Sequence, residues 1–560
     1  MADGFITARD HSERSDLNIV ILHCHFERGG VTQVVENHVR SLCERGLCER
    51  GLGERGLGER GDVDRIVLVS GDRISGLSSA TREAVEHVVL PDFDYDAKPW
   101  KSDSLAERSQ RICCSLLQQF ESRGMDPSDS ILHWHNHSLG KNTAAPEVIR
   151  LLAGKRWRLL LQIHDFAEDS RPENYLRLIN AIDADEPRSV DRYLYPLAPQ
   201  IHYCTLTRAD ARALGEIGIP KQRVSYLPNT VLAPAGDSAS SDGLSRDKSL
   251  AMVRQVLGLP SDARWCLYPV RGIRRKNVGE FLLISQLAPE DCYFGLTLCP
   301  ATPVERRSYQ RWKRVAPQFA SRALFDVGQH AELPFVNSLL ASEYVLSTSV
   351  AEGFGMAFLE PWLLRREVIA RRLANVADDF VESGMTLSKF YDSIAIPGTP
   401  DWLARCHEQY ARSVEQAWGR LPERFRPSLT LGPEGNDAID FARLVPSEQV
   451  RVLQRISEDA SFRHQVLERS SQLVTDLRTP MDPKAIELNG KIVQENYSPA
   501  VLSERLMSLY QALIDTPIDQ DSSFDDHDDA GPRIGIAVER INRTRPFYPC
   551  RTEELASERT

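Results

Sequence analysis

Two glutamates in the run EGFGMAFLE, Glu352 and Glu360, have the spacing to hold the two ends of one ligand. Gly353, Phe354 and Gly355 form a predicted turn into a helix, with Glu360 about a turn and a half into it. A glycine-rich helix start leaves backbone N–H groups free, and the helix dipole adds positive charge there, so the place suits a phosphate. A nucleotide-sugar, with a diphosphate between its sugar and its ribose, fits this pattern.

A second run, RGIRRKN, supplies cations after a predicted strand. Breaking a glycosyl–diphosphate bond builds negative charge on the leaving phosphate, and fixed cations lower that barrier. Arg271 can bind two oxygens through its planar guanidinium, and Lys276 acts as a point charge. These side chains make a metal unnecessary. Arg274 and Arg275 either extend this anion site or form a solvated turn.

The elements that must position these residues alternate between strands and helices. Continuous apolar runs such as LNIVILHCH and WRLLLQIHD recur from residue 17 to about 230, and they restart with WCLYPV and end with VIARR. Apolar strands that alternate with helices indicate parallel sheets covered on both faces. Two such blocks predict two doubly wound α/β domains, with the ligand between the carboxyl ends of their strands.

Composition divides the rest of the chain. Four tandem pentapeptides (CERGL, CERGL, GERGL, GERGD) place a glycine at every fifth residue, which argues against a stable helix and favours a surface loop; a partner-binding arm is the alternative. The predicted segments are a disordered tail (1–16), a first domain (17–232) with the repeat loop (43–62), a linker (233–250), a second domain (251–497) with a helical insert (380–497), a terminal helix crossing back (498–516) and a mostly disordered acidic tail (517–560).

Charge and composition narrow the class of protein. The chain has 560 residues, 42% of them hydrophobic, and a net charge of −11, which is unlike a nucleic-acid binder. No apolar run approaches the ~18 residues of a membrane span, and the first residues lack the apolar core of a signal peptide. The 11 cysteines are scattered, as expected for free thiols. We therefore expect a cytoplasmic protein.

Four motifs together resemble a known family. RGIRRKN and EGFGMAFLE, in this order along the chain, are similar to the signatures of glycosyltransferase family four, whose members are retaining enzymes with two facing Rossmann-like domains (the GT-B fold). ERGGVTQVV resembles the family's N-terminal glycine loop and includes Gly30. SYLPNTV resembles its Pro-Asn-Gly segment, although Thr230 replaces the usual glycine. Pro361, where the family has alanine, is expected to remove a backbone bond from the helix.

The resemblance implies a hexosyltransferase that uses a nucleoside-diphosphate sugar, needs no metal or other cofactor and retains the anomeric configuration. It implies that Glu352 contacts the sugar's hydroxyls and Glu360 the ribose, and that Gly30 and the turn 353–355 bind the donor. The first domain is then the acceptor side, and a C-terminal helical extension completes the fold. In this family the leaving phosphate is thought to accept the acceptor's proton, so no separate protein base is needed.

Histidines end two of the predicted strands. His164 matches a family position that faces the donor sugar, and strand ends in such sheets are where ligands bind; a structural role is the alternative. His135 and His137 alternate in HWHNH. A zinc site there lacks a matching carboxylate or cysteine spacing, so we predict that both lie near the acceptor.

Several points stay open at this stage. The acceptor is a saccharide, a lipid or a small metabolite, and peripheral membrane contact and the oligomeric state are undecided; nucleic acid is not an expected partner. A disaccharide phosphorylase, a small-metabolite glycoside synthase and a non-catalytic sugar-binding homologue are the alternative functions. The paired glutamates with Arg271 and Lys276 argue against the last of these.

Overall fold

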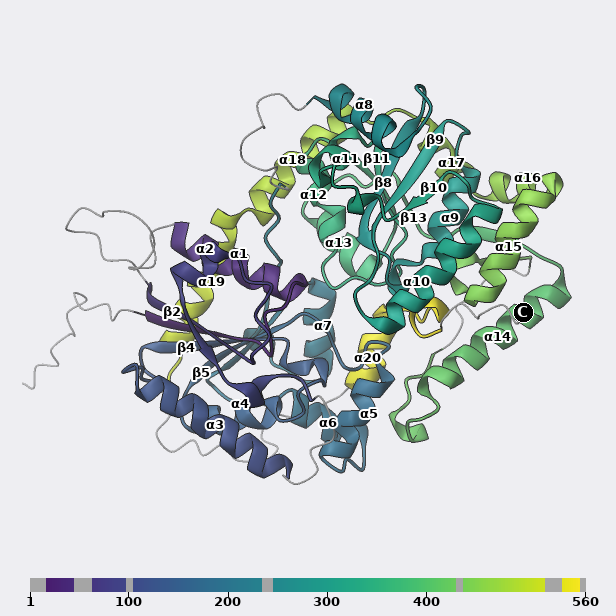
Figure 1. Ribbon diagram of the computed structural model, residues 1–560. Helices are drawn as coiled ribbons and strands as arrows, with labels where there is room; N and C mark the ends of the chain where they lie inside the picture. The colour runs from purple at the N-terminus through teal and green to yellow at the C-terminus, as the bar shows by residue number, and fades with distance from the viewer. Residues whose placement is uncertain are drawn as a thin grey trace, which may run out of the picture.

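Two parallel sheets, each covered by helices, form two domains that face one another in the computed structural model (Figure 1). The structure describes residues 17–44, 63–96, 104–233, 245–429, 437–518 and 536–553. The predicted tail 1–16, most of the repeat loop, most of the linker and much of 517–560 lie outside these residues. The predicted α/β class with two facing doubly wound domains is confirmed.

The first domain contains a seven-stranded parallel sheet in the order β3-β2-β1-β4-β5-β6-β7. The order reverses between β1 and β4, where a doubly wound sheet binds its ligand. Its central strands, such as β1 and β4, are buried on both faces, which explains their unbroken apolar runs. They are β1 (Leu17–Leu22), β2 (Val63–Ser70), β3 (Glu86–Val89), β4 (Ser130–His135), β5 (Arg158–Ile163), β6 (Ile201–Thr205) and β7 (Val224–Tyr226).

Helices cover both faces of this sheet. One core contains residues of α3 (Leu105–Glu121), α4 (Ala145–Gly154), α5 (Pro172–Ala181), α6 (Pro187–Leu194) and α7 (Arg208–Glu216). The opposite core contains α1 (Gly30–Glu44) and, from far along the chain, α19 (Pro499–Asp515); α2 (Ser79–Ala84) packs beside α1. The terminal helix thus lies against the first domain, where Arg158 donates to the carbonyl oxygens of Leu513 (2.8 Å) and Ile514 (3.0 Å).

The second domain contains a six-stranded parallel sheet in the order β10-β9-β8-β11-β12-β13. Its strands are β8 (Arg264–Arg271), β9 (Cys292–Leu298), β10 (Ala323–Phe325), β11 (Tyr344–Ser347), β12 (Glu367–Arg371) and β13 (Phe390–Tyr391). The surrounding helices are α8 (Arg246–Leu257), α9 (Val278–Leu287), α10 (Pro303–Val315), α11 (Phe335–Ala341), α12 (Glu360–Leu363), α13 (Ala374–Glu382), α15 (Pro446–Glu458), α16 (Ala460–Arg469), α17 (Ser471–Arg478) and α18 (Pro483–Tyr497).

The region 380–497 is not purely helical, because it contains β13 and a small antiparallel pair, β14 (Ala395–Pro397) with β15 (Ala438–Asp440). Its long helix α14 (Pro400–Trp418) joins the two domains. Leu403 and Cys406 pack in the core of the second domain, whereas Trp418 is buried in the core of the first.

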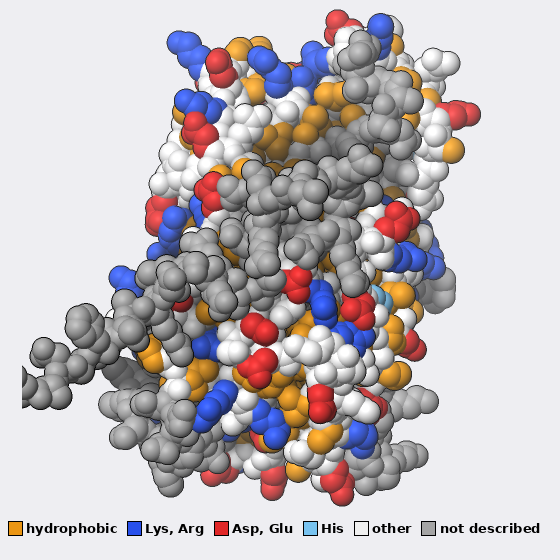
Figure 2. Space-filling view, turned by 90° about the vertical axis from the view of Figure 1, so that its left-hand side faces the viewer, with side chains coloured by type: hydrophobic (Ala, Val, Ile, Leu, Met, Phe, Trp, Pro, Cys, Tyr) orange, Lys and Arg blue, Asp and Glu red, His pale blue; other side chains and the backbone are white. Residues whose placement is uncertain are grey.

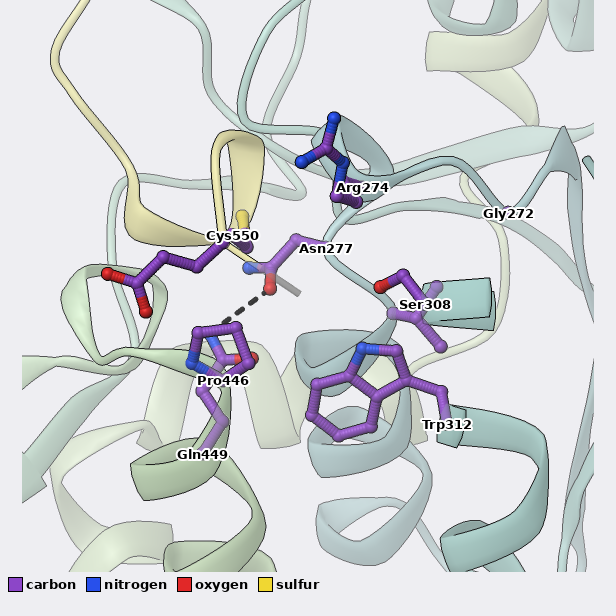
Figure 3. A pocket seen from close by; sticks show the side chains of 10 residues that line it. Gly272, Arg274, Asn277, Ser308, Trp312, Pro446, Gln449 and Cys550 are labelled. Atoms are coloured by element: carbon purple, nitrogen blue, oxygen red, sulfur yellow. Dashed lines mark hydrogen bonds between the residues drawn. The ribbon is translucent and has the colours of Figure 1, made fainter. Parts of the chain in front are cut away.

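The C-terminal segment, residues 536–553, is an ordered part of the range 517–560, which the sequence predicted to be mostly disordered. Its helix α20 (Ala537–Thr544) packs on α6 and α7 and lies between the domains (Figure 1). Beyond it, Tyr548 and Cys550 pack with Val350 and Ala442 of the second domain. Figure 3 shows Cys550 beside Asn277. The sequence prediction extended the disorder expected for the preceding acidic run over this segment and so overlooked its apolar residues.

The surface carries both signs of charge. On the described part of the face in Figure 2, Lys and Arg side chains are intermixed with Asp and Glu over both domains. None of the described helices combines the length and the apolar composition needed to cross a bilayer.

Candidate active site

Glu352 lies at the centre of the second sheet's carboxyl edge. It follows β11, and β11 pairs with β8, after which a 3₁₀ turn, Arg274–Lys276, carries the cations. One carboxylate oxygen of Glu352 accepts from Lys276 Nζ, and the other accepts from Arg275 Nη1 at 3.1 Å. The Arg274–Lys276 turn is held in place by a hydrogen bond in which the Thr348 hydroxyl donates to the Lys276 carbonyl oxygen at 2.8 Å.

The charges of Glu352, Lys276 and Arg275 stabilise one another. Burial raises the pKa of Glu352, but the nearby cations Lys276 and Arg275 outweigh it and lower the pKa to about 2. Burial lowers the pKa of Lys276, and Glu352 opposes that shift. Glu352 is therefore an anion that holds two cations at the cleft, where developing negative charge could meet them.

Arg271 is not part of the cluster of Glu352, Lys276 and Arg275. Its side chain is exposed at the end of β8 and makes no ion pair or hydrogen bond with the described residues. Arg275, which the sequence left as either part of the anion site or a residue of a solvated turn, forms an ion pair with Glu352. The signal was present in RGIRRKN, but spacing alone could not decide which arginine turns inward.

The glycine turn after Glu352 is held closely. A Cβ atom on Gly353 would lie 3.0 Å from the His164 carbonyl oxygen, across the gap between the domains. Gly355 has a φ of +82°, a conformation that favours glycine. The Phe354 side chain is buried against Phe380 and Tyr497, so it anchors the turn and does not line the cleft.

Glu360 begins the short helix α12, after a 3₁₀ turn (Met356–Phe358), and does not lie further inside a helix as predicted. Pro361 therefore sits in the first turn, where its missing N–H costs no backbone bond, and the expected loss is wrong. Burial raises the pKa of the Glu360 carboxyl to about 7. Glu360 makes no ion pair with the described residues and remains available to hydroxyls.

His164 approaches the same place from the first domain. It follows β5, and it lines a small interdomain cavity together with Glu352 and Gly353. Its Nε2 lies 2.9 Å from His135 Nδ1. Burial lowers the pKa of His164 to about 4, so the imidazole is neutral at pH 7.

His135 and His137 are buried (0% and 3% exposed), and neither lines the interdomain cavity, so the prediction that they lie near the acceptor stays a prediction. His135 lies behind His164. The Nε2 atom of His137 lies 3.1 Å from the Leu194 carbonyl oxygen. Asn136, with a φ of 62°, ends the strand between the two histidines, so their side chains do not lie on the same face of it. Gly30 is the first residue of α1, and a Cβ there would meet open space.

The zinc site considered in the sequence concerned His135 and His137, whereas the structure brings together His38, His133 and His135, whose potential ligand atoms lie within 4.8 Å of one another. Both nitrogens of His133 already have partners, the Tyr510 hydroxyl at 2.9 Å and the Gln162 side-chain oxygen at 3.0 Å. A metal would have to displace one of these hydrogen bonds.

The sequence and the fold were compared with those of known proteins. No family model matches the chain. It is similar to the mannosylglucosyl-3-phosphoglycerate synthase of Petrotoga mobilis, with 28% identity over 412 residues, which cover 71% of this chain and 73% of the relative. Its fold resembles a glycosyltransferase from Rickettsia africae, with a TM-score of 0.52, 12% identity and coverage of 90% of this chain and 100% of that one. The chain is a glycosyltransferase with the GT-B fold.

A second solved structure agrees with this fold. The catalytic domain of starch synthase IV from Arabidopsis thaliana, bound to ADP and acarbose, superposes with a TM-score of 0.50 at 12% identity and covers 89% of this chain and 100% of that one. In this glycosyltransferase, Glu352 and His164 face one another across the interdomain cleft.

The C-terminal segment adds residues to the glycosyltransferase site that sequence reasoning missed. Arg551 Nη1 lies 2.8 Å from Asp169 Oδ1, and Arg545 Nη2 lies 2.7 Å from Asp210 Oδ1. Both arginines line the cavity that contains His164 and Glu352. Next to Arg551, the carbonyl oxygen of Thr552 accepts a hydrogen bond from Arg274 at 2.9 Å. The arginines in RINRTRPFYPCR were the available signal.

Proposed function

We propose that this glycosyltransferase moves a hexose from a nucleoside-diphosphate sugar to a hydroxyl of an anionic glycoside, with retention and without a metal. The observation that carries the proposal is Glu352 held between Lys276 and Arg275 at the carboxyl edge of the second sheet, opposite His164. This arrangement puts fixed cations beside the place where a donor's sugar and diphosphate would meet.

Each residue has a role in the proposed transfer. Lys276 and Arg275 stabilise the leaving diphosphate, and Arg271, exposed nearby, binds its outer oxygens. The backbone of Gly353 and Gly355 approaches the phosphates. Glu352 and neutral His164 bind hydroxyls of the donor sugar, and Glu360 binds the ribose.

The bond changes balance without a protein base or a metal. The acceptor oxygen forms a bond to the anomeric carbon, the bond from that carbon to the diphosphate oxygen breaks, and the leaving diphosphate takes the acceptor's proton. Attack and departure on one face of the sugar retain its configuration. The side-chain cations supply the positive charge that a metal would otherwise bring.

The relative from Petrotoga mobilis supports an anionic acceptor, because its name describes the synthesis of a glycoside that carries 3-phosphoglycerate. We therefore propose glucosyl-3-phosphoglycerate, or a glycoside like it with phosphate and carboxylate groups, as the acceptor class. A cytoplasmic location is proposed as well, and the free thiols of the ten cysteines that the structure describes support it.

A screen of nucleotide-sugars tests this function. The full chain is incubated with GDP-mannose, GDP-glucose, UDP-glucose and ADP-glucose, and the released nucleoside diphosphate is measured with and without glucosyl-3-phosphoglycerate. We expect one donor to release nucleotide, faster with the acceptor. If phosphate in place of a nucleotide-sugar drives the cleavage of a disaccharide, the enzyme is a phosphorylase and the proposal fails.

A further inference from the structure

A cavity of about 360 Å³ opens beside Glu352, within the range of small-molecule sites. Five parts of the chain form its wall: the loop after β11, the loop after β12, the first turns of helix α13, helix α7 and the C-terminal segment. The side chains that carry charge into it are Arg212, Glu352, Arg372, Asp378, Arg543 and Arg545.

The charges around this cavity do not balance. Glu352 is neutralised by Lys276 and Arg275, as described above. Asp378 pairs with Arg372 at 2.7 Å, and Arg545 is held by Asp210 at 2.7 Å. The cavity's two carboxylates therefore have partners already, and so does one buried arginine.

Arg212 and Arg543 are the cations left over. Both are exposed, and neither forms an ion pair with the described residues. Arg212 lowers the pKa of Asp379 slightly against the larger effect of burial, but the Asp379 carboxylate accepts from the Arg208 backbone at 2.8 Å and lies 3.9 Å from its guanidinium. Two guanidinium groups from different elements thus face one cavity without a counter-charge.

We propose that Arg212 and Arg543 bind the phosphate or carboxylate of the acceptor in this cavity. Guanidinium groups bind such oxyanions through paired hydrogen bonds, and two of them on separate elements can hold one anion between them. The inference rests on the proposed function, since it concerns the acceptor of the same transfer. It makes the C-terminal segment part of the substrate site.

Arg545 then has a positioning role. It is buried (7% exposed), and its ion pairs with Asp210 and Asp169 fix the chain two residues after Arg543. Asn542 adds a hydrogen bond to the Glu168 carbonyl at 2.7 Å. The end of α20 is therefore held in place, and little ordering is needed when an anion binds.

Calorimetry with 3-phosphoglycerate as the probe tests the proposal, with inorganic phosphate and glycerate as separate probes for its two anionic groups. We expect each of Arg212→Ala and Arg543→Ala to weaken binding about tenfold, and the double variant about a hundredfold, in line with losing charged hydrogen bonds. Arg540→Ala is the matched control: Arg540 lies one turn earlier on α20, pairs with Glu216 at 3.2 Å and does not line the cavity.

The outcomes are distinguishable. Wild-type affinity in the double variant overturns the proposal, provided that the variant still binds the nucleoside diphosphate and is therefore folded. If the wild-type enzyme transfers hexose to a neutral sugar and does not bind 3-phosphoglycerate, the inference falls while glycosyl transfer stands. If no nucleotide-sugar reacts with any acceptor, the proposed function itself fails.

Discussion

The carbonyl oxygen of His164 faces Gly353 so closely that a Cβ atom at position 353 would lie 3.0 Å from it. His164 belongs to the first domain and Gly353 to the second, so the backbones of the two domains approach one another closely at this point of the site. Glycine is the only residue that allows this approach without pushing a neighbour away.

Replacing Gly353 with alanine should lower kcat/KM about 10- to 100-fold, because the added methyl group separates the two sides of the cleft and misplaces the reacting groups. Gly215→Ala is the control, since a Cβ there meets nothing within 4 Å. Steady-state kinetics on both variants check this. Wild-type kcat/KM in Gly353→Ala would show that the domains do not meet in the reactive state.

Lys276→Met should lower kcat about 10²–10³-fold, as expected for the loss of one group that stabilises charge in the transition state. The comparison is Lys491→Met, which removes an exposed lysine paired with Glu495 on α18 and should not change kcat. Turnover at the wild-type rate by Lys276→Met would mean that the diphosphate lies elsewhere.

Buried histidines should make the fold sensitive to mild acid. Burial lowers the pKa of His23 and His133 to about 3 and of His164 to about 4, whereas an unfolded imidazole titrates near 6.5. As pH falls from 6.5 to 4, the unfolded chain binds protons that the folded chain does not, so the free energy of unfolding falls. Each buried imidazole contributes about 1.4 kcal/mol per pH unit in this window. Glu168, whose pKa burial raises to about 8, works in the opposite direction.

Urea unfolding at pH 7.5 and pH 5.5 measures this effect. The wild-type midpoint should be lower at pH 5.5, and His133→Gln should have a shallower pH dependence because one of the shifted groups is gone. His464→Gln, which removes an exposed histidine of α16, should follow the wild type. Identical slopes for His133→Gln and the wild type would contradict the role of burial.

Activity should survive EDTA, because Lys276 and Arg275 provide the positive charge beside Glu352. Transfer rates with EDTA, with added magnesium and with added manganese should agree within about twofold. Complete loss in EDTA, reversed by either ion, would contradict metal-independent transfer.

The sequence predicted the parts of the fold that depend on local patterns. Apolar runs ended by glycine and polar residues marked β1, β4, β8 and β11 within a few residues, because strands buried on both faces have few alternatives. Because ligands bind at the carboxyl ends of the strands in such sheets, Glu352 and Lys276 could be assigned to one site without any long-range information. His164 reached the cleft for the same reason.

What the sequence could not predict depends on long-range packing. Whether Arg271 or Arg275 turns toward Glu352 is decided by the 3₁₀ turn after β8, and no periodicity encodes that choice. His135 and His137 separate because Asn136 adopts a left-handed conformation. The C-terminal segment follows an acidic stretch in the sequence. Its place at the site is shown by long-range contacts, of Ala537 with Asp191 and of Arg545 with Asp169 and Asp210.

Mass spectrometry of the transfer product tests the central claim most directly. The full chain, in EDTA, is given the donor identified by the screen together with glucosyl-3-phosphoglycerate, beside the Lys276→Met variant as the inactive comparison. The account predicts an acceptor that has gained one hexose, one nucleoside diphosphate released for each, and little product from the variant. Nucleotide-sugar that stays intact with every acceptor, although calorimetry shows that it binds, would identify a sugar-nucleotide-binding protein and contradict the account.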